Sequence, residues 1–174
     1  MKRILLFTLL TTFLAMGTSA QKMIGVGAEL SILSFKPNVR VWLSKTTGVE
    51  IFGGIATELE DINPDDVEGG FKFLHTIQYK RTDRTYFGLV GKWKWLNAFD
   101  ANKSAHVPIP GILVGKEWFS KKRALKGLAV ELGYQYGVKE YEIFSPFSHL
   151  PIAKERFEEF PLILNLRYSF YTKK

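Results

Sequence analysis

The chain has 174 residues, no cysteine and a formal net charge of +7, with 24 Lys and Arg residues against 17 Asp and Glu residues. The absence of cysteine excludes disulfides, thiolate metal sites and an anchor acylated on an amino-terminal cysteine. The basic residues are spread through expected turns and do not gather on one helix or stripe, so the positive charge does not indicate a nucleic-acid-binding protein.

The first 20 residues have the three parts of a secretory signal peptide. Lys2 and Arg3 give a basic start, an apolar run continues to Leu14, and small residues precede the expected cleavage site. The apolar run is well short of the roughly 20 residues that a membrane helix needs. We therefore expect residues 1–20 to be removed as a signal peptide and residues 21–174 to form one exported domain.

No later stretch is apolar for long enough to form a membrane helix, so the exported chain can enter a membrane only as a closed barrel. The segment 161–171 has the clearest strand pattern, because its alternate residues form one apolar face while Asn165, Arg167 and Ser169 lie on the other. About eleven residues tilted near 45° rise about 25 Å, which is the height of the apolar band of a membrane barrel.

The same alternation predicts seven further strands, at residues 23–34, 39–44, 49–55, 71–80, 85–96, 111–119 and 127–138. The connections alternate between short basic turns (45–48, 81–84 and 120–126) and longer loops (58–70, 97–110 and 139–160). One connection, 35–38, is short where a longer loop is expected. The alternation in length is typical of outer-membrane barrels. The predicted fold is therefore all-β, an eight-stranded antiparallel up-and-down transmembrane β-barrel.

The same period of two also describes a soluble lipocalin-like carrier, in which the apolar face lines a cavity for a small apolar ligand. The apolar face of this chain is nearly unbroken, with aromatic residues towards its ends, as membrane interfaces require. The opposite face is rich in Gly, Ala and Ser and is expected to hold few charges, which suits a crowded interior. These features favour the membrane barrel and leave the carrier as an alternative.

The residues Leu166, Arg167, Tyr168, Ser169 and Phe170 are similar to the aromatic-ended final strand that the barrel-assembly machinery recognises. Together with the strand pattern, they make the chain resemble the OmpA-like and OmpX-like group of small eight-stranded outer-membrane barrels of Gram-negative bacteria. The resemblance implies an outer-membrane location, contact with lipid and lipopolysaccharide, and assembly through the C-terminal strand. Members of the group include structural anchors, host-interaction proteins and lipid-modifying enzymes. A structural or surface-interaction role is expected, and a lipid A or phospholipid-modifying enzyme is the alternative.

Histidines are the first candidates for catalysis. His75 falls on the apolar face of its strand, where an outward-facing neutral imidazole, or one turned inward by a bulge, explains it without chemistry. His106 lies in an expected loop. Ser148 and His149 adjoin in the longest expected loop and suggest a Ser/His esterase, but adjacent residues usually point apart and no acid is spaced to orient the imidazole. We therefore assign no catalytic residue.

No metal or cofactor site is expected either. The acidic segment 58–70 contains six carboxylates without the spacing of a calcium loop, and we expect it to be solvated and to contact lipopolysaccharide. No paired-carboxylate or Gly-rich phosphate motif is present. The apolar residues of 139–160, including Phe144 and Phe147, predict either a partner surface or a loop packed on itself. The external partner is not identified by the sequence.

Four charged residues are predicted to point into the barrel at one level: Glu29, Arg40, Glu131 and Arg167. All lie roughly four to six residues from the short-turn end of their strands. The first and last strands must be neighbours if the barrel closes, which sets Glu29 beside Arg167. An eight-stranded barrel is just wide enough for side chains to fill, and buried charges must be paired. The sequence therefore predicts a lumen that is plugged by this one layer of paired charges and does not conduct ions.

Overall fold

The computed structural model describes residues 23–32, 34–56, 66–96, 105–120, 125–144 and 151–173. These ranges form ten β-strands: β1 (Met23–Ser31), β2 (Ser34–Trp42), β3 (Thr47–Ala56), β4 (Asp66–Tyr79), β5 (Asp83–Leu96), β6 (Ala105–Ser120), β7 (Leu125–Gln135), β8 (Val138–Phe144), β9 (Pro151–Glu158) and β10 (Leu162–Lys173). No helix of sufficient length and apolar character to cross a membrane occurs within them.

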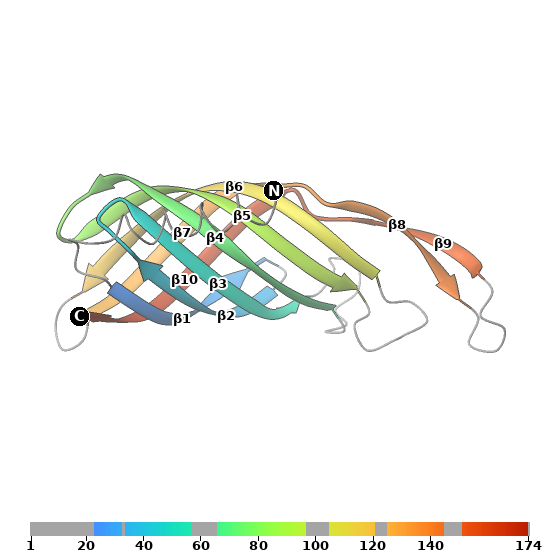
Figure 1. The fold of residues 1–174 in the computed structure, drawn as a ribbon, viewed down its shortest axis with the longest axis horizontal. Helices are drawn as coiled ribbons and strands as arrows, with labels where there is room; N and C mark the ends of the chain where they lie inside the picture. The colour runs from blue at the N-terminus through green and yellow to red at the C-terminus, as the bar shows by residue number, and fades with distance from the viewer. Residues whose placement is uncertain are drawn as a thin grey trace, which may run out of the picture.

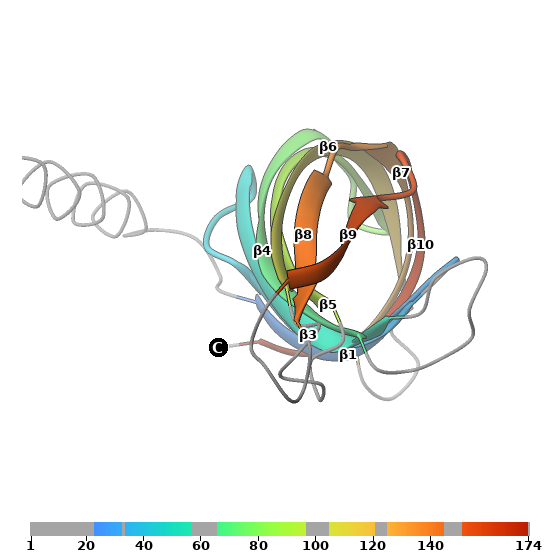
Figure 2. The ribbon, with the colours of Figure 1, turned by 90° about the vertical axis from the view of Figure 1, so that its right-hand side faces the viewer.

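Eight of the strands close into an antiparallel barrel in the order β1-β10-β7-β6-β5-β4-β3-β2 (Figures 1 and 2). The first and last strands meet along the closing seam, where Met23 pairs with Lys173 and Ser31 with Asn165. The predicted eight-stranded all-β barrel is confirmed. The short connections 43–46 and 80–82 lie at one end with the start of β1 and the end of β10, and we call this the turn end. The opposite end is called the loop end.

The apolar alternation of each strand places its apolar face on the outside of the barrel. Large apolar side chains are exposed on all eight barrel strands, and the exposed fraction reaches 67% at Ile51 and 66% at Ile77. Exposed aromatic residues lie towards both ends, with Trp93 and Tyr134 near the loop end and Trp118 and Phe170 near the turn end. The outside of the barrel is therefore an apolar belt with aromatic borders.

The prediction that residues 35–38 form a connection was wrong, because β2 begins at Ser34. Phe35 points outward and Lys36 inward, so the alternation continues through Pro37. Pro37 pairs with Ala28 of β1, whereas the pairing of β2 with β3 is interrupted at Lys36 and Pro37. A proline has no backbone donor and is tolerated where a ladder is interrupted. The turn-forming character of proline misled the sequence analysis here.

The prediction that residues 139–160 form a loop was also wrong, because this segment contains most of a second, two-stranded sheet. Strands β8 and β9 pair as an antiparallel hairpin, which extends beyond the loop end in Figure 1. Viewed from that end, the hairpin lies in front of the barrel opening (Figure 2). The hairpin leaves the barrel after β7 and returns at β10, so it adds to the barrel without interrupting it.

Two prolines explain why β7 pairs with only part of β6. Strand β6 pairs with β5 as far as Ala105, but β7 follows β6 only to Gly111. The Tyr136 N–H donates to the Pro110 carbonyl, which places that carbonyl on the edge away from β5. The N and C=O of a residue share one edge of an antiparallel strand, so Pro108 and Pro110 lack donors only on this edge. The pairing of β5 with β6 therefore continues to Ala105, whereas β8 pairs with β9 and not with β6.

Candidate functional site

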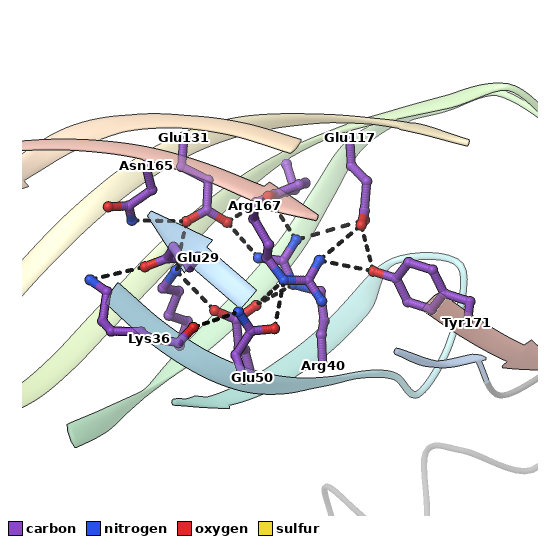
Figure 3. Close-up of polar contacts among 12 residues, drawn as sticks. Glu29, Lys36, Arg40, Glu50, Glu117, Glu131, Asn165, Arg167 and Tyr171 are labelled. Carbon is purple, nitrogen blue, oxygen red and sulfur yellow. Dashed lines mark hydrogen bonds and ion pairs between the residues drawn. The ribbon is translucent and has the colours of Figure 1, made fainter. Parts of the chain in front are cut away.

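The side chains that the sequence placed in one inward layer, Glu29, Arg40, Glu131 and Arg167, all lie inside the barrel with 0% exposure (Figure 3). Arg40 Nη2 lies 2.5 Å from Glu131 Oε1. The backbone register pairs Glu29 with Arg167 across the closing seam. The charged groups of Glu29 and Arg167 nevertheless contact residues of other strands, so the register alone does not give the ion pairs.

Arg40 of β2 connects three other strands across the lumen. Its Nε lies 2.5 Å from Glu50 Oε2 of β3, and its Nη1 donates to the Tyr86 hydroxyl of β5 at 2.7 Å. Its Nη2 contacts Glu131 of β7, to which the Tyr86 hydroxyl also donates at 2.6 Å. The planar guanidinium presents several donors in a fixed fork, so one side chain serves three partners at once.

Lys72 of β4 is the second connecting cation. Its ammonium pairs with Glu29, with Glu50 at 2.9 Å and with Glu131 at 2.6 Å. An ammonium has three N–H donors, and each is matched by a carboxylate from a different strand. The Asn165 amide donates to Glu131 Oε2 at 3.2 Å and adds β10 to the same group.

Arg167 of β10 binds the turn-end side of this group. Its Nε donates to Asn38 Oδ1 at 2.9 Å and lies 3.1 Å from Glu50 Oε2. Its Nη1 donates to Glu117 Oε1 at 2.9 Å, and the Tyr171 hydroxyl donates to the same oxygen at 2.5 Å. Every barrel strand thus supplies a member of what we call the central network, which comprises Glu29, Asn38, Arg40, Glu50, Lys72, Tyr86, Glu117, Glu131, Asn165, Arg167 and Tyr171.

A second set of ion pairs, the loop-end cluster, comprises Lys36, Asp66, Glu68, Lys92, Lys94 and Glu159. Lys36 connects the two sets, because its Nζ lies 3.0 Å from Glu29 and 3.3 Å from Glu68. Glu159, which follows β9, lies 2.7 Å from Lys92 Nζ and anchors the base of the hairpin to the barrel. The Gln135 amide donates to the same carboxylate at 3.0 Å.

The interior holds many more charges than the sequence analysis expected. The buried acids of the described ranges are Glu29, Glu50, Asp66, Glu68, Glu117, Glu131 and Glu159, and the buried bases are Lys36, Arg40, Lys72, Arg84, Lys92, Lys94 and Arg167. The two sets are equal in number. The expectation of an interior with few charges was therefore wrong. The expectation that the 58–70 segment is solvated was wrong for Asp66 and Glu68, because both belong to β4 and their side chains lie inside the barrel. The numerical balance limits the cost of burying the charges.

Aromatic rings fill the lumen between the central network and the turn end. The rings of Trp42 and Tyr86 meet edge to face with centroids 5.6 Å apart, and those of Phe119 and Tyr171 do so at 5.7 Å. The Arg84 guanidinium lies 3.7 Å from the Trp42 ring centroid, and its Nε and Nη1 have no hydrogen-bond partner. The quadrupole of the indole ring stabilises this cation in place of a carboxylate.

The loop-end side of the lumen contains a cavity of about 30 Å³, bordered by Lys36, Lys92 and Asn165 among others. A volume of this size accommodates about one or two water molecules. It has no room for an apolar ligand such as a lipocalin-like carrier would hold.

The β8–β9 hairpin contributes an apolar contact above the loop-end cluster. Phe157 of β9 is buried with Leu96 of β5 and with Val107 and Ile109 of β6. Lys94 Nζ lies 4.8 Å from the Phe157 ring centroid. The hairpin is thus attached to the barrel by both apolar packing and charge.

The candidate histidines do not join these groups. His75 points outward next to an irregularity of the β4–β5 register at Thr76, and His106 is exposed with its ring 6.0 Å from that of Trp95. Ser148, His149 and the expected signal peptide lie outside the described residues. Within the described ranges, no group of three or more His, Cys, Asp or Glu side chains is arranged to hold a metal ion.

Sequence reasoning missed Glu50, Lys72 and Glu117 as members of the central network, although the alternation along their strands puts them on the inward faces. It estimated height by counting residues from the turns, but barrel strands are tilted and staggered, so that count does not give the level in the lumen. Pairing β2 with β3 outward from the turn at 43–46 sets Arg40 opposite Glu50, and the β3–β4 register sets Glu50 opposite Lys72. The short turn was therefore a signal that could have found Glu50 beside Arg40.

In comparisons with known proteins, no protein-family model matches this chain, and no curated protein matches it significantly.

Proposed function

We propose that this protein is an outer-membrane β-barrel with a structural or surface-interaction role and a lumen that does not conduct ions. The observation that carries the proposal is the inverted distribution of its side chains, with charges inside and large apolar groups outside. Soluble proteins rarely expose a contiguous apolar surface that encircles the molecule, whereas a bilayer requires one. The aromatic borders of the belt match the two interfaces of a membrane.

The interior supports a non-conducting lumen. In the central network, Arg40 lies 2.5 Å from carboxylates of β3 and β7, and Arg167 lies 2.9 to 3.1 Å from carboxylates of β6 and β3. Aromatic rings follow towards the turn end. An ion crossing this barrel has to displace buried ion pairs, each of which costs several kcal/mol to break. The same interior disfavours the carrier alternative, which needs apolar walls. The enzyme alternative rests on Ser148 and His149, which lie outside the described residues.

In this proposal, the barrel lies in the outer membrane in contact with lipid and lipopolysaccharide, and the assembly machinery recognises it through β10. The long connections and the β8–β9 hairpin face outside, where the hairpin is the element available to a partner. The turn end faces the periplasm.

Membrane insertion is tested by fractionation. The protein in cell envelopes should remain in the membrane pellet after carbonate washing, and the purified protein should float with lipid vesicles after refolding. Folded and boiled samples should migrate differently on gels, because a closed barrel resists detergent until it is heated. Release of the protein by carbonate contradicts the proposal.

Conductance is tested on the same vesicle-inserted sample, so that insertion is established before current is recorded. The parent protein should give no steady ion current after transfer to planar bilayers. Reproducible open steps in the parent contradict a closed lumen without contradicting the membrane location.

A further inference from the structure

Exposed charge is distributed unequally between the two ends of the molecule. The turn end carries five exposed bases in the described ranges, namely Lys45, Lys80, Arg81, Lys116 and Lys126. The described ranges hold two acids at this end: Glu117 is inside the barrel, and Asp83 is half-buried opposite Trp118 in the β5–β6 register. The turn end is therefore a basic collar, a name we keep for these five residues.

The hairpin at the opposite end has the reverse composition. Its exposed acids are Glu140, Glu142, Glu155 and Glu158, and its exposed bases are Lys154 and Arg156. Exposed acids outnumber exposed bases on this element, whereas the described part of the turn end has no fully exposed acid. The collar therefore reflects the position of the charges and not merely the basic composition of the chain.

Two collar lysines form a local site with aromatic rings on the outer wall of β6, β7 and β10. Lys116 Nζ lies 5.6 Å from the Trp118 ring centroid, and Lys126 Nζ lies 5.5 Å from that of Phe170. Trp118 is nearer to the turn end than Lys116 along β6, so the Lys116 ammonium is directed towards that end. Trp118 and Phe170 are 41% and 52% exposed, which leaves both rings on the belt surface.

This arrangement matches the chemistry of a phospholipid at a membrane interface. The lysine stems run along apolar surface while their ammonium groups reach the polar boundary, and the rings lie at headgroup level. An ammonium binds phosphate as a point charge, and each basic side chain near a membrane surface strengthens binding of anionic lipid. We propose that the basic collar, with Lys116 and Lys126 at its centre, binds the headgroups of anionic phospholipids. This inference rests on the membrane location proposed above.

The test uses Trp118 as the reporter in a W93F/W95F background. Those substitutions leave Trp118 as the exposed indole of a chain with four tryptophans, because Trp42 is 0% exposed inside the barrel. The protein is refolded into vesicles containing either brominated phosphatidylglycerol or brominated phosphatidylcholine, and quenching of Trp118 gives the relative binding constant of the two lipids. At low salt we expect a preference for phosphatidylglycerol of roughly fivefold, the effect of about one basic side chain at a membrane surface. Added salt should reduce the preference.

The K116Q/K126Q variant should bring the relative binding constant close to one, and K116R/K126R should retain the preference. The matched control is K154Q/R156Q, which removes the same charge from the hairpin and should leave the preference unchanged. Equal quenching by both lipids in the parent, or an equal loss in the hairpin control, overturns the collar proposal alone. Absence of quenching by either lipid overturns both the collar and the membrane location. Heat-dependent gel mobility establishes that each variant is folded.

Discussion

Single arginine side chains inside this barrel each bind groups from several strands. Arg167 contacts groups from β2, β3 and β6 as well as a hydroxyl of its own strand, and none of its surface is exposed. A buried charge that loses its partner keeps the desolvation cost and loses the attraction that offset it. The effect of removing such a residue therefore depends on the acids that remain behind.

We predict that Arg167→Leu lowers the free energy of unfolding by about 3 to 5 kcal/mol, because Glu117 and Glu50 lose a buried cation. The control is Lys154→Leu, which breaks an exposed pair with Glu142 at 3.6 Å and should cost about 0 to 1 kcal/mol. Urea unfolding of both variants in the same vesicles measures the difference. Equal midpoints for Arg167→Leu and the parent contradict a structural role for the network.

Two glycines offer a matched test of packing. A Cβ built at Gly115 meets Cζ of the Tyr86 ring at 2.5 Å, and that ring is held by hydrogen bonds to Arg40 and Glu131. Gly115→Ala should therefore destabilise the barrel by about 1 to 3 kcal/mol through overpacking. At Gly53 the nearest atom to such a Cβ is 3.7 Å away, so Gly53→Ala should change stability by no more than about 0.5 kcal/mol. Urea midpoints that do not differ between the two variants contradict the packing argument.

Among the elements, the β8–β9 hairpin differs most from its neighbours. Among the described strands, β8 and β9 pair with each other and with no barrel strand. The Glu159 N–H donates to the Gly137 carbonyl at 2.8 Å where the hairpin joins the barrel. The two ends of the hairpin are therefore already close enough to be joined by a tight turn. The backbone pairs between β7 and β10 run from Tyr134 with Leu162 to Leu125 with Tyr171, and no hairpin residue takes part in them.

We predict that replacing residues 138–158 by a two-residue turn leaves the barrel able to close. The shortened protein should refold into vesicles and keep its heat-dependent gel mobility, since the central network and Glu159 are retained. Phe157→Ala is the companion variant, because it removes the main apolar contact of the hairpin without shortening the chain. Failure of the shortened protein to refold, with Phe157→Ala folding normally, would show that the hairpin is part of the barrel's folding unit.

The period of two predicted the barrel strands well because every strand of a closed sheet has one face towards the lumen and one away from it. The limits of the strands were less predictable wherever proline or acidic residues lie within them. Pro37 and Pro108 looked like turn residues, but each occupies a position where the missing donor is not needed. Asp66 and Glu68 looked like loop residues, but cations from other strands lie opposite them inside.

The candidate site was predictable in its location and not in its partners. Alternation identifies which side chains point inward, and closure identifies the neighbours of the first and last strands. Lys72 contacts three carboxylates from other strands, and two of these strands are not its neighbours in the sheet. Strand alternation and neighbour pairing do not give the distance between side chains across the lumen. The hairpin was missed because its charged residues alternate without an apolar face of the length seen in the barrel strands.

At the level of the whole molecule, the proposed orientation can be tested with single cysteines, since the natural chain contains none. We predict that Lys154→Cys reacts with a membrane-impermeant maleimide on intact cells, because the hairpin faces outside in the proposed orientation. Lys80→Cys should react only after the outer membrane is permeabilised. Both positions are exposed, so a difference in labelling reports topology and not burial. The reverse pattern would invert the proposed orientation.

The contribution of all eight strands to one ionic core has a consequence for incomplete copies of the chain. A chain that ends before β10 lacks Arg167 and leaves Glu117 and Glu50 short of a cation, and a chain without Glu29 leaves Lys36 and Lys72 short of an acid. Such a chain has no closed state of low energy, because buried charges without partners are costly. We therefore expect a truncated copy to remain open, because only a chain with all eight barrel strands can pair every charge of this core.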